Sequence, residues 1–192
     1  MPSKDPILTP ELLKIIKIFG LASILLVVVF SFFDSYRANN SGEDRTFRMT
    51  SASRLYFLNL KAINYVRENR SDAGMVLYRH NGFGLESEEA TLILVLILNS
   101  QKDESYLYLE PKNIDWPIRL SFEENGQTRL LNFENGNKFD HLEQVTQLQK
   151  LLDEEVKLFL LDEDQKILLW SSESEKEAVK STFEDYFRII EN

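Results

Sequence analysis

The chain lacks cysteine entirely, and it holds only two histidines among its 192 residues. Without cysteine it can form no disulfide, no thiolate zinc site and no cysteine-ligated iron–sulfur cluster, and it has no cysteine nucleophile. The chain also has fewer basic than acidic residues: 22 lysines and arginines and 31 aspartates and glutamates give a net charge of −9. A nucleic-acid-binding protein usually presents a basic face to phosphates. We therefore expect no nucleic-acid partner, no metal and no cofactor.

The two histidines belong to no recognisable catalytic motif. His80 lies in a glycine-containing turn, YRHNGFG, and His141 follows an aspartate at a predicted helix start. No nucleophile motif or paired histidine accompanies either of them. Gly82 and Gly84 give G-x-G without the third glycine and the following helix of a dinucleotide-binding fingerprint. The pattern predicts a structural role for His80, a surface position for His141 and a protein that is not an enzyme.

The most distinctive segment is apolar. Residues 12–33, LLKIIKIFGLASILLVVVFSFF, form a stretch of 22 residues whose only charges are Lys14 and Lys17. A helix needs about 20 mostly apolar residues to span a bilayer, and lysines near one end can reach the headgroups. Thr9 and Pro10 suit the first positions of such a helix. The segment predicts an uncleaved single-pass anchor after a short tail, residues 1–11. A cleaved signal peptide and a buried soluble helix are the alternatives.

The orientation of the anchor depends on the positive charges beside it. Lys4 and the terminal amine precede the span, Lys14 and Lys17 lie near its N-terminal end, and three arginines follow it. Positively charged flanks tend to stay in the cytoplasm. The small excess on the N-terminal side predicts a cytoplasmic N-terminus and an extracytoplasmic large domain, with a cytoplasmic domain as the alternative.

Charge is unevenly distributed after the anchor. Residues 34–53 are polar and predict a tether, and residues 54–192 are long enough for a compact domain. Residues 45–80 carry seven bases and two acids, whereas residues 140–192 carry fourteen acids and six bases. Two solvated faces would explain this bias; alternatively, the basic portion rests on anionic headgroups. In the second interpretation, the headgroup contacts come from Lys14, Lys17, Arg45 and Arg48, and the lipid bilayer is a partner.

The first part of the domain reads as strands. Alternation and β-branched or aromatic content predict them at residues 55–60, 75–79, 91–98, 106–109, 118–122 and 129–133. The third is apolar on both faces and should be central. Asn125 and Gly126 predict a tight hairpin turn between the last two. Residues 55–66 could equally form an amphipathic helix, since the periodicity fits both structures.

Two helices are predicted later in the chain. The first begins at Asp140, with Glu143 as its capping-box partner, and the second begins at Ser174, with Glu177. A hairpin of residues 156–161 and 166–170 lies between them. Short connections favour antiparallel pairing, so the predicted class is α+β, a mainly antiparallel sheet covered by the two helices of the C-terminal half.

An aromatic cluster offers a candidate contact surface. Tyr106 and Tyr108 should share one side of their strand, and Trp116 follows closely. An exposed cluster of this kind suits a partner or ligand, because tyrosine and tryptophan combine apolar area with a hydrogen-bonding tip. If the same side faces the helices, these residues belong to the core, which is the favoured interpretation.

The anchor, the single small domain and the lack of a catalytic motif together predict a non-enzymatic single-pass membrane protein. Its expected role is that of an accessory or scaffolding subunit that binds protein partners in a larger membrane assembly. The alternative is an anchored binding or sensing module for a peptide or small ligand, and an anchored enzyme using aspartate or glutamate ranks third. An extended apolar patch without a pocket would favour assembly, whereas an apolar cleft with converging polar groups would favour ligand binding.

Overall fold

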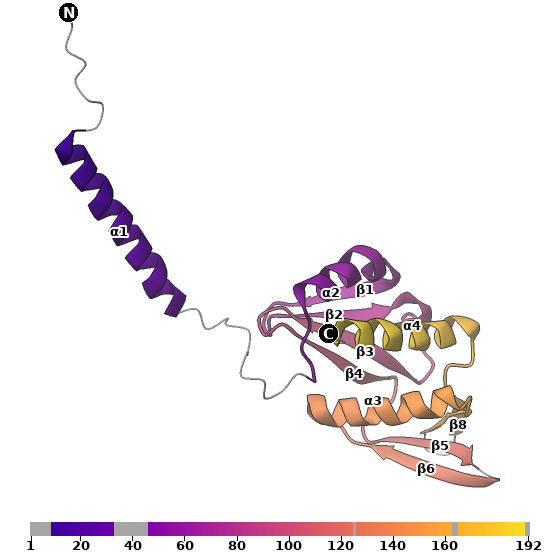
Figure 1. The fold of residues 1–192 in the computed structure, drawn as a ribbon. Helices are drawn as coiled ribbons and strands as arrows, with labels where there is room; N and C mark the ends of the chain where they lie inside the picture. The colour runs from indigo at the N-terminus through magenta and orange to yellow at the C-terminus, as the bar shows by residue number, and fades with distance from the viewer. Residues whose placement is uncertain (1–8, 33–45, 125, 163–164, 191–192) are drawn as a thin grey trace, which may run out of the picture. The chain divides into compact units, whose positions relative to one another are not determined.

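The computed structural model describes residues 9–32, 46–124, 126–162 and 165–190 (Figure 1). The chain divides into two compact units, Met1–Ser41 and Gly42–Asn192. In the first unit, helix α1 runs over Pro10–Phe32, and Thr9 Oγ1 accepts a hydrogen bond from Leu12 N at 3.3 Å. The predicted cap at Thr9 is therefore confirmed. Residues Pro10–Val29 are long and apolar enough to cross a membrane or to act as a signal anchor.

The second unit contains two antiparallel four-stranded sheets where the sequence predicted one (Figure 1). The α+β class and the antiparallel pairing are confirmed. Sheet 1 has the strand order β1-β2-β3-β4, with β1 (Tyr65–Arg70), β2 (Met75–His80), β3 (Thr91–Asn99) and β4 (Glu104–Lys112). Sheet 2 has the order β6-β5-β7-β8, with β5 (Ile118–Glu124), β6 (Gln127–Phe133), β7 (Phe159–Asp162) and β8 (Gln165–Leu168).

Strand β3 is the most deeply buried element. It pairs with β2 on one side and with β4 on the other, and every side chain along it is buried except that of Ile97, which is half-buried. The sequence predicted this central position from the apolar residues on both faces of the strand. Both faces of sheet 1 are consequently covered near its middle.

The hairpin predicted at Asn125 and Gly126 is confirmed. Glu124 pairs with Gln127 across the turn, and Gly126 has a φ of +77°, a backbone conformation that favours glycine. Asn125 itself lies outside the described residues. The turn sets the register of the edge strand β6 against β5, so that Ile118 faces Phe133 at the far end.

The strand predicted at residues 55–60 is wrong, and the helical alternative describes this segment as far as Asn64, whereas Tyr65 and Val66 begin strand β1. Helix α2 (Ser51–Tyr56) continues into a π-helical turn, η1 (Phe57–Lys61), and a 3₁₀ turn, η2 (Ala62–Asn64). The helix forms because Thr50 and Ser53 cap its first turn reciprocally. Only Phe57 is buried over these turns, which a strand covered on one face would not produce.

Two segments that the sequence analysis left outside the sheet are part of the fold. Strand β1, with the polar sequence YVRENR, has no apolar alternation, and pairing with β2 alone defines it. Phe47 and Met49, within the predicted tether, are 1% and 2% exposed. Phe47 O accepts a hydrogen bond from Ser105 N at 2.8 Å, and Met49 N donates to Asp103 O at 2.9 Å. The folded unit therefore begins before residue 54.

Both late helices are present, but their caps differ from the predicted ones. Helix α3 (Lys138–Asp153) is capped by Asn137, with Asp140 as its capping-box partner. Asp140 is therefore the third residue of the helix rather than its cap. At helix α4 (Glu173–Ile190), Ser172 Oγ accepts from Glu175 N at 3.2 Å and Glu175 Oε2 accepts from Ser172 N at 3.0 Å. This box lies two residues before the predicted one.

Helix α4 packs against β3 and β4 of sheet 1, and α3 packs along β4 (Figure 1). Val145 and Leu148 of α3 and Val179, Phe183 and Tyr186 of α4 are buried in one core with residues of both sheets. The two sheets and the two helices thus share a single hydrophobic core. The C-terminal half of α4 lies beside the α2 segment.

Candidate functional site

A cleft of about 1360 Å³ is present in the described part of the domain. It lies between α4, the end of α3 and the segment that follows β8. Nine apolar residues line it, among them Leu152, Val156, Leu168, Trp170, Val179, Phe183 and Phe187. Nine charged residues line it as well, among them Lys157, Lys176, Lys180 and Glu184. A cleft that combines apolar side chains with polar groups is a candidate ligand-binding site.

The periodicity of α4 builds one wall of this cleft. Val179, Phe183 and Phe187 recur every four residues and therefore lie along one side of the helix. Trp170 forms part of the opposite boundary, and its indole Nε1 donates a hydrogen bond to the carbonyl oxygen of Leu92 at 2.9 Å. This bond ties the segment after β8 to strand β3 of sheet 1. The side chain of Trp170 is 4% exposed, so most of its ring is held by the core.

A buried carboxylate lies at the border of the cleft. Asp185 of α4 is 4% exposed, and its Oδ2 accepts a hydrogen bond from the Tyr65 hydroxyl at 2.9 Å. Its Oδ1 lies 3.5 Å from Nζ of Lys61, which also lines the cleft. Burial raises the pKa of Tyr65 well above its ordinary value, and the negative charge of Asp185 adds to this shift. The tyrosine therefore stays protonated and acts as a donor to the carboxylate.

His80 lies close to this carboxylate cluster but plays a structural role. Its Nδ1 accepts a hydrogen bond from Gly82 N at 3.1 Å and so caps the 3₁₀ turn Asn81–Phe83. Its ring meets that of Tyr65 edge-on, with 4.9 Å between centroids. Burial lowers the pKa of His80, and the charges of Asp185 and Glu177 oppose this shift only in part. The imidazole is neutral at pH 7, and its acceptor nitrogen is already occupied.

The predicted aromatic residues lie at a different, smaller hollow. Tyr106 and Tyr108 line a space of about 340 Å³ together with Lys138 and His141. Tyr106 is 8% exposed and donates its hydroxyl proton to the carboxylate of Glu104. Its ring is 5.6 Å from that of Phe47. The hollow is smaller than the cleft at α4, and most of the Tyr106 ring is buried by its neighbours.

Trp116 does not line this hollow, although it contacts the same histidine. The ring of Tyr108 lies 4.0 Å from that of His141, and the ring of Trp116 lies 5.7 Å from it. Tyr108 and Trp116 are both half-buried. The structure therefore brings the three predicted residues around α3, with only part of each side chain open. Their role as a partner surface stays a prediction.

His141 is buried where the sequence predicted a surface residue. It is 1% exposed, and its Nδ1 accepts a hydrogen bond from Leu109 N at 3.3 Å, which satisfies a backbone donor of the edge strand β4. Burial lowers its pKa, so the ring is neutral, with its proton on Nε2. Nε2 has no hydrogen-bond partner among the described residues. Its position four residues before Val145 of the apolar stripe could have revealed the burial.

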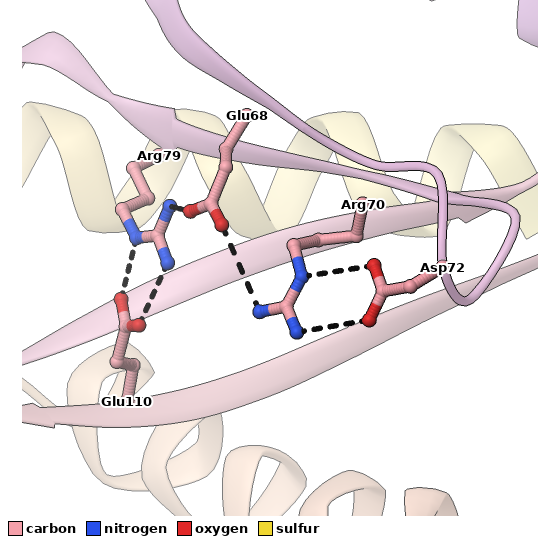
Figure 2. Close-up of polar contacts among 5 residues, drawn as sticks. All are labelled: Glu68, Arg70, Asp72, Arg79 and Glu110. Carbon is pink, nitrogen blue, oxygen red and sulfur yellow. Dashed lines mark hydrogen bonds and ion pairs between the residues drawn. The ribbon is translucent and has the colours of Figure 1, made fainter.

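The face of sheet 1 that points away from α4 carries a ladder of ion pairs, which Figure 2 shows across β4, β2 and β1. Arg79 holds the centre: its Nε and Nη2 donate to the Glu110 carboxylate at 2.6 and 2.7 Å, and its Nη1 donates to Glu68 at 2.7 Å. Arg70 extends the ladder from Glu68 to Asp72, at 3.8 and 3.2 Å. Hydrogen bonding to Glu110 raises the pKa of Arg79. These bonds crosslink three strands.

The ladder and other ion pairs neutralise much of the basic charge that the sequence placed at residues 45–80. Arg54 lies 3.3 Å from Asp103. Of the predicted headgroup contacts, Lys14 and Lys17 are exposed on α1, and Arg45 lies outside the described residues. Arg48 is half-buried and pairs with Glu104 in an isolated β-bridge. Headgroup contact by these four residues stays a prediction.

Comparison with known proteins adds no family to this description. No protein-family model, no curated protein and no solved structure matches the chain.

Proposed function

We propose that the chain is a non-enzymatic, membrane-anchored binding module whose cleft holds a short apolar segment of a protein partner. The observation that carries the proposal is the cleft of about 1360 Å³ beside α4, whose lining combines apolar side chains with a buried carboxylate. Pockets for small ligands usually measure about 300–1,000 Å³, so the larger space suits an extended peptide. Assembly by a patch without a pocket, the first expectation from the sequence, becomes the second candidate.

The walls of the cleft indicate the chemistry of the ligand. Leu168, which is 40% exposed, and the half-buried Val156 and Phe187 offer apolar surface, which gains free energy when an apolar side chain displaces water. The Lys61–Asp185 pair can bind a backbone N–H or C=O group of an extended segment, because a carboxylate has more acceptor sites than the Tyr65 hydroxyl uses. The lining carries five cations and four anions, which favours no strong net charge on the ligand.

In this proposal α1 spans the bilayer once, with the N-terminus in the cytoplasm and the domain outside. Support comes from its length and composition, since Pro10–Val29 has the span of a bilayer-crossing helix. Protease added to intact cells tests the orientation. The domain should be degraded without lysis, and protection until lysis would place it in the cytoplasm instead.

The cleft is tested by two matched leucine substitutions in the full-length chain. Leu168 is 40% exposed on the edge strand β8 and lines the cleft, whereas Leu130 is 65% exposed on the edge strand β6 and does not. Ten-residue peptides selected from a displayed library against the detergent-solubilised chain serve as the probe. We expect Leu168→Glu to weaken their binding at least about tenfold, because a carboxylate at an apolar contact must be desolvated.

Leu130→Glu should bind the same peptides as the unchanged chain. Equal affinities of both variants and the unchanged chain would place the peptides elsewhere and contradict the proposal. Co-purification of stoichiometric partner chains that both variants retain would favour the accessory-subunit role.

A further inference from the structure

Exposed apolar side chains are concentrated in one short segment of the domain. Nine large hydrophobic residues are exposed in the described part of the domain, and six of them fall within residues 55–66. They are Leu55 (53%), Tyr56 (36%), Leu58 (40%), Leu60 (59%), Ile63 (84%) and Val66 (48%). The first five, on α2, η1 and η2, are called the apolar patch here; Val66 follows Tyr65 on β1 and therefore lies on the other face of the sheet. Scattered single apolar residues are normal on a protein surface, but a concentration of this kind marks an interaction site.

The local structure explains why these side chains point outward together. Helix α2 and the turns η1 and η2 hold the domain through Phe57, which is 1% exposed and contacts the rings of Tyr65 and Tyr78. The remaining large apolar residues of these turns therefore lie on the side away from sheet 1. The segment is held firmly, since Ser53 Oγ donates to the carbonyl oxygen of Ile189 on α4 at 2.9 Å. The exposed face is thus part of the folded unit.

The charges around the apolar patch all have one sign along the chain. Residues 46–67 contain no aspartate or glutamate, although the whole chain has 31 acids, and they carry four bases. Arg54 and Lys61 are paired with Asp103 and Asp185 from other segments, and Arg67 is exposed. Arg188 of α4 adds a further cation, because its Nη1 donates to the Tyr56 hydroxyl at 2.7 Å and its guanidinium lies 4.8 Å from the Tyr56 ring centroid. Apolar side chains framed by lysine and arginine are typical of elements that lie in the interface of an anionic membrane.

Insertion of α1 in a membrane would keep the domain close to the bilayer surface. Thirteen residues, 33–45, separate the described end of α1 from the first described residue of the domain. A chain of that length reaches at most about 45 Å, so a membrane surface is always within range of the domain once α1 is inserted. The apolar patch follows only ten residues after this connection. Tethering raises the local concentration of the bilayer surface and makes even a weak contact persistent.

We propose that the apolar patch docks on the bilayer, with Leu60 and Ile63 inserted at the headgroup boundary and the surrounding cations on anionic lipid. The docked domain is then held at the membrane by two contacts, the α1 span and the patch. This inference rests on the proposed anchoring of α1 and is independent of what the cleft binds.

The absence of cysteine allows a direct test. Ile63→Cys, Leu130→Cys and Val27→Cys each create a single labelling site in the full-length chain, and all three positions are exposed. A nitroxide is attached to each variant, the chain is reconstituted in vesicles of phosphatidylcholine and phosphatidylglycerol, and the accessibility of the label to oxygen and to a nickel chelate is measured. We expect the label at residue 63 to be accessible to oxygen and protected from nickel, and the label at residue 130 to be accessible to nickel.

The label at residue 27 separates the two proposals. If the label at residue 27 is in lipid and the label at residue 63 is in water, the docking of the patch is overturned and the anchoring stands. If the label at residue 27 is in water, the anchoring is overturned. Spin–spin broadening between labels at residue 63 would show that a second copy of the chain covers the patch, and that result also overturns docking on lipid.

A second experiment tests whether the patch causes the docking. A label at Asn59→Cys, between Leu58 and Leu60, should be protected from nickel in the same vesicles. Leu60→Glu together with Ile63→Glu should remove that protection, because the new carboxylates are repelled by anionic lipid. Protection that survives both substitutions would contradict the proposal. Both positions are exposed, so the fold does not depend on them.

Discussion

The two faces of sheet 1 carry polar networks of opposite design. On one face, Arg79 is 17% exposed and donates three hydrogen bonds to Glu68 and Glu110, so its charge is well compensated. On the face toward α4, Asp185 is 4% exposed and accepts one hydrogen bond, from Tyr65, with Lys61 3.5 Å away. The ladder crosslinks strands, whereas the buried carboxylate retains acceptor capacity at the border of a cleft. The difference separates a network suited to stability from one suited to binding.

Removal of the buried carboxylate should have the largest effect. Asp185→Ala leaves the Tyr65 hydroxyl buried without its acceptor, and we expect the free energy of unfolding to fall by about 2 kcal/mol. Asp185→Asn keeps an acceptor and should lose about half as much. Urea unfolding of the detergent-solubilised chain measures both. An alanine variant as stable as the original chain would show that Tyr65 does not need this partner, and the contrast between the two faces would disappear.

The ladder should be more tolerant. Arg79→Met leaves Glu68 and Glu110 without their shared cation, and we expect a loss of about 1 kcal/mol, because the network is partly exposed and screened by solvent. The loss should shrink as salt is raised. Arg70→Met is the matched control, since Arg70 is 51% exposed, and its effect should stay below about 0.5 kcal/mol. Equal losses for the two variants would mean that position in the ladder does not matter.

The smallest effect concerns pH. Burial lowers the pKa of His80 and of His141 below the ordinary value of 6.5. The unfolded chain therefore binds protons more readily than the folded one in this range. The stability that the neutral rings contribute is present above pH 6.5 and is lost as the pH falls through the lower pKa values of the folded state.

Thermal unfolding at a series of pH values between about 8 and 5 measures this loss. His141→Gln cannot titrate, so the decline in midpoint should become shallower, and His80→Gln should act in the same direction. An unchanged slope in both variants would indicate that carboxylates alone govern the acid sensitivity of the domain.

The sequence predicted the elements that depend on local patterns. β3 was recognised because apolar residues fill both of its faces, and the hairpin was recognised because Gly126 tolerates a positive φ. The segment at residues 55–66 was ambiguous for a physical reason. Its apolar residues fit a strand or a helix, and the helix is favoured by the capping box of Thr50 and Ser53 together with the buried ring of Phe57, a tertiary contact.

The candidate site could not be predicted in the same way, because its members are distant in the sequence. Asp185 and Tyr65 are 120 residues apart, and Arg79 and Glu110 are 31 apart. One signal was nevertheless present. Ala178, Thr182, Asp185 and Ile189 recur at helical spacing beside the predicted stripe of α4, and all four are buried. A carboxylate within such a stripe indicates a buried charge that needs partners from elsewhere in the chain.

Lys61 and Arg188 belong both to the surroundings of the apolar patch and to the lining of the cleft. If the patch rests on lipid, the entrance of the cleft opens beside the headgroups. A partner carried by the same membrane then meets the cleft by lateral diffusion within a thin layer, at an effective concentration of about millimolar, whereas a soluble competitor does not share this advantage. Selectivity for a membrane-borne partner would then follow from shared location, and a weak contact in the cleft would be sufficient for it.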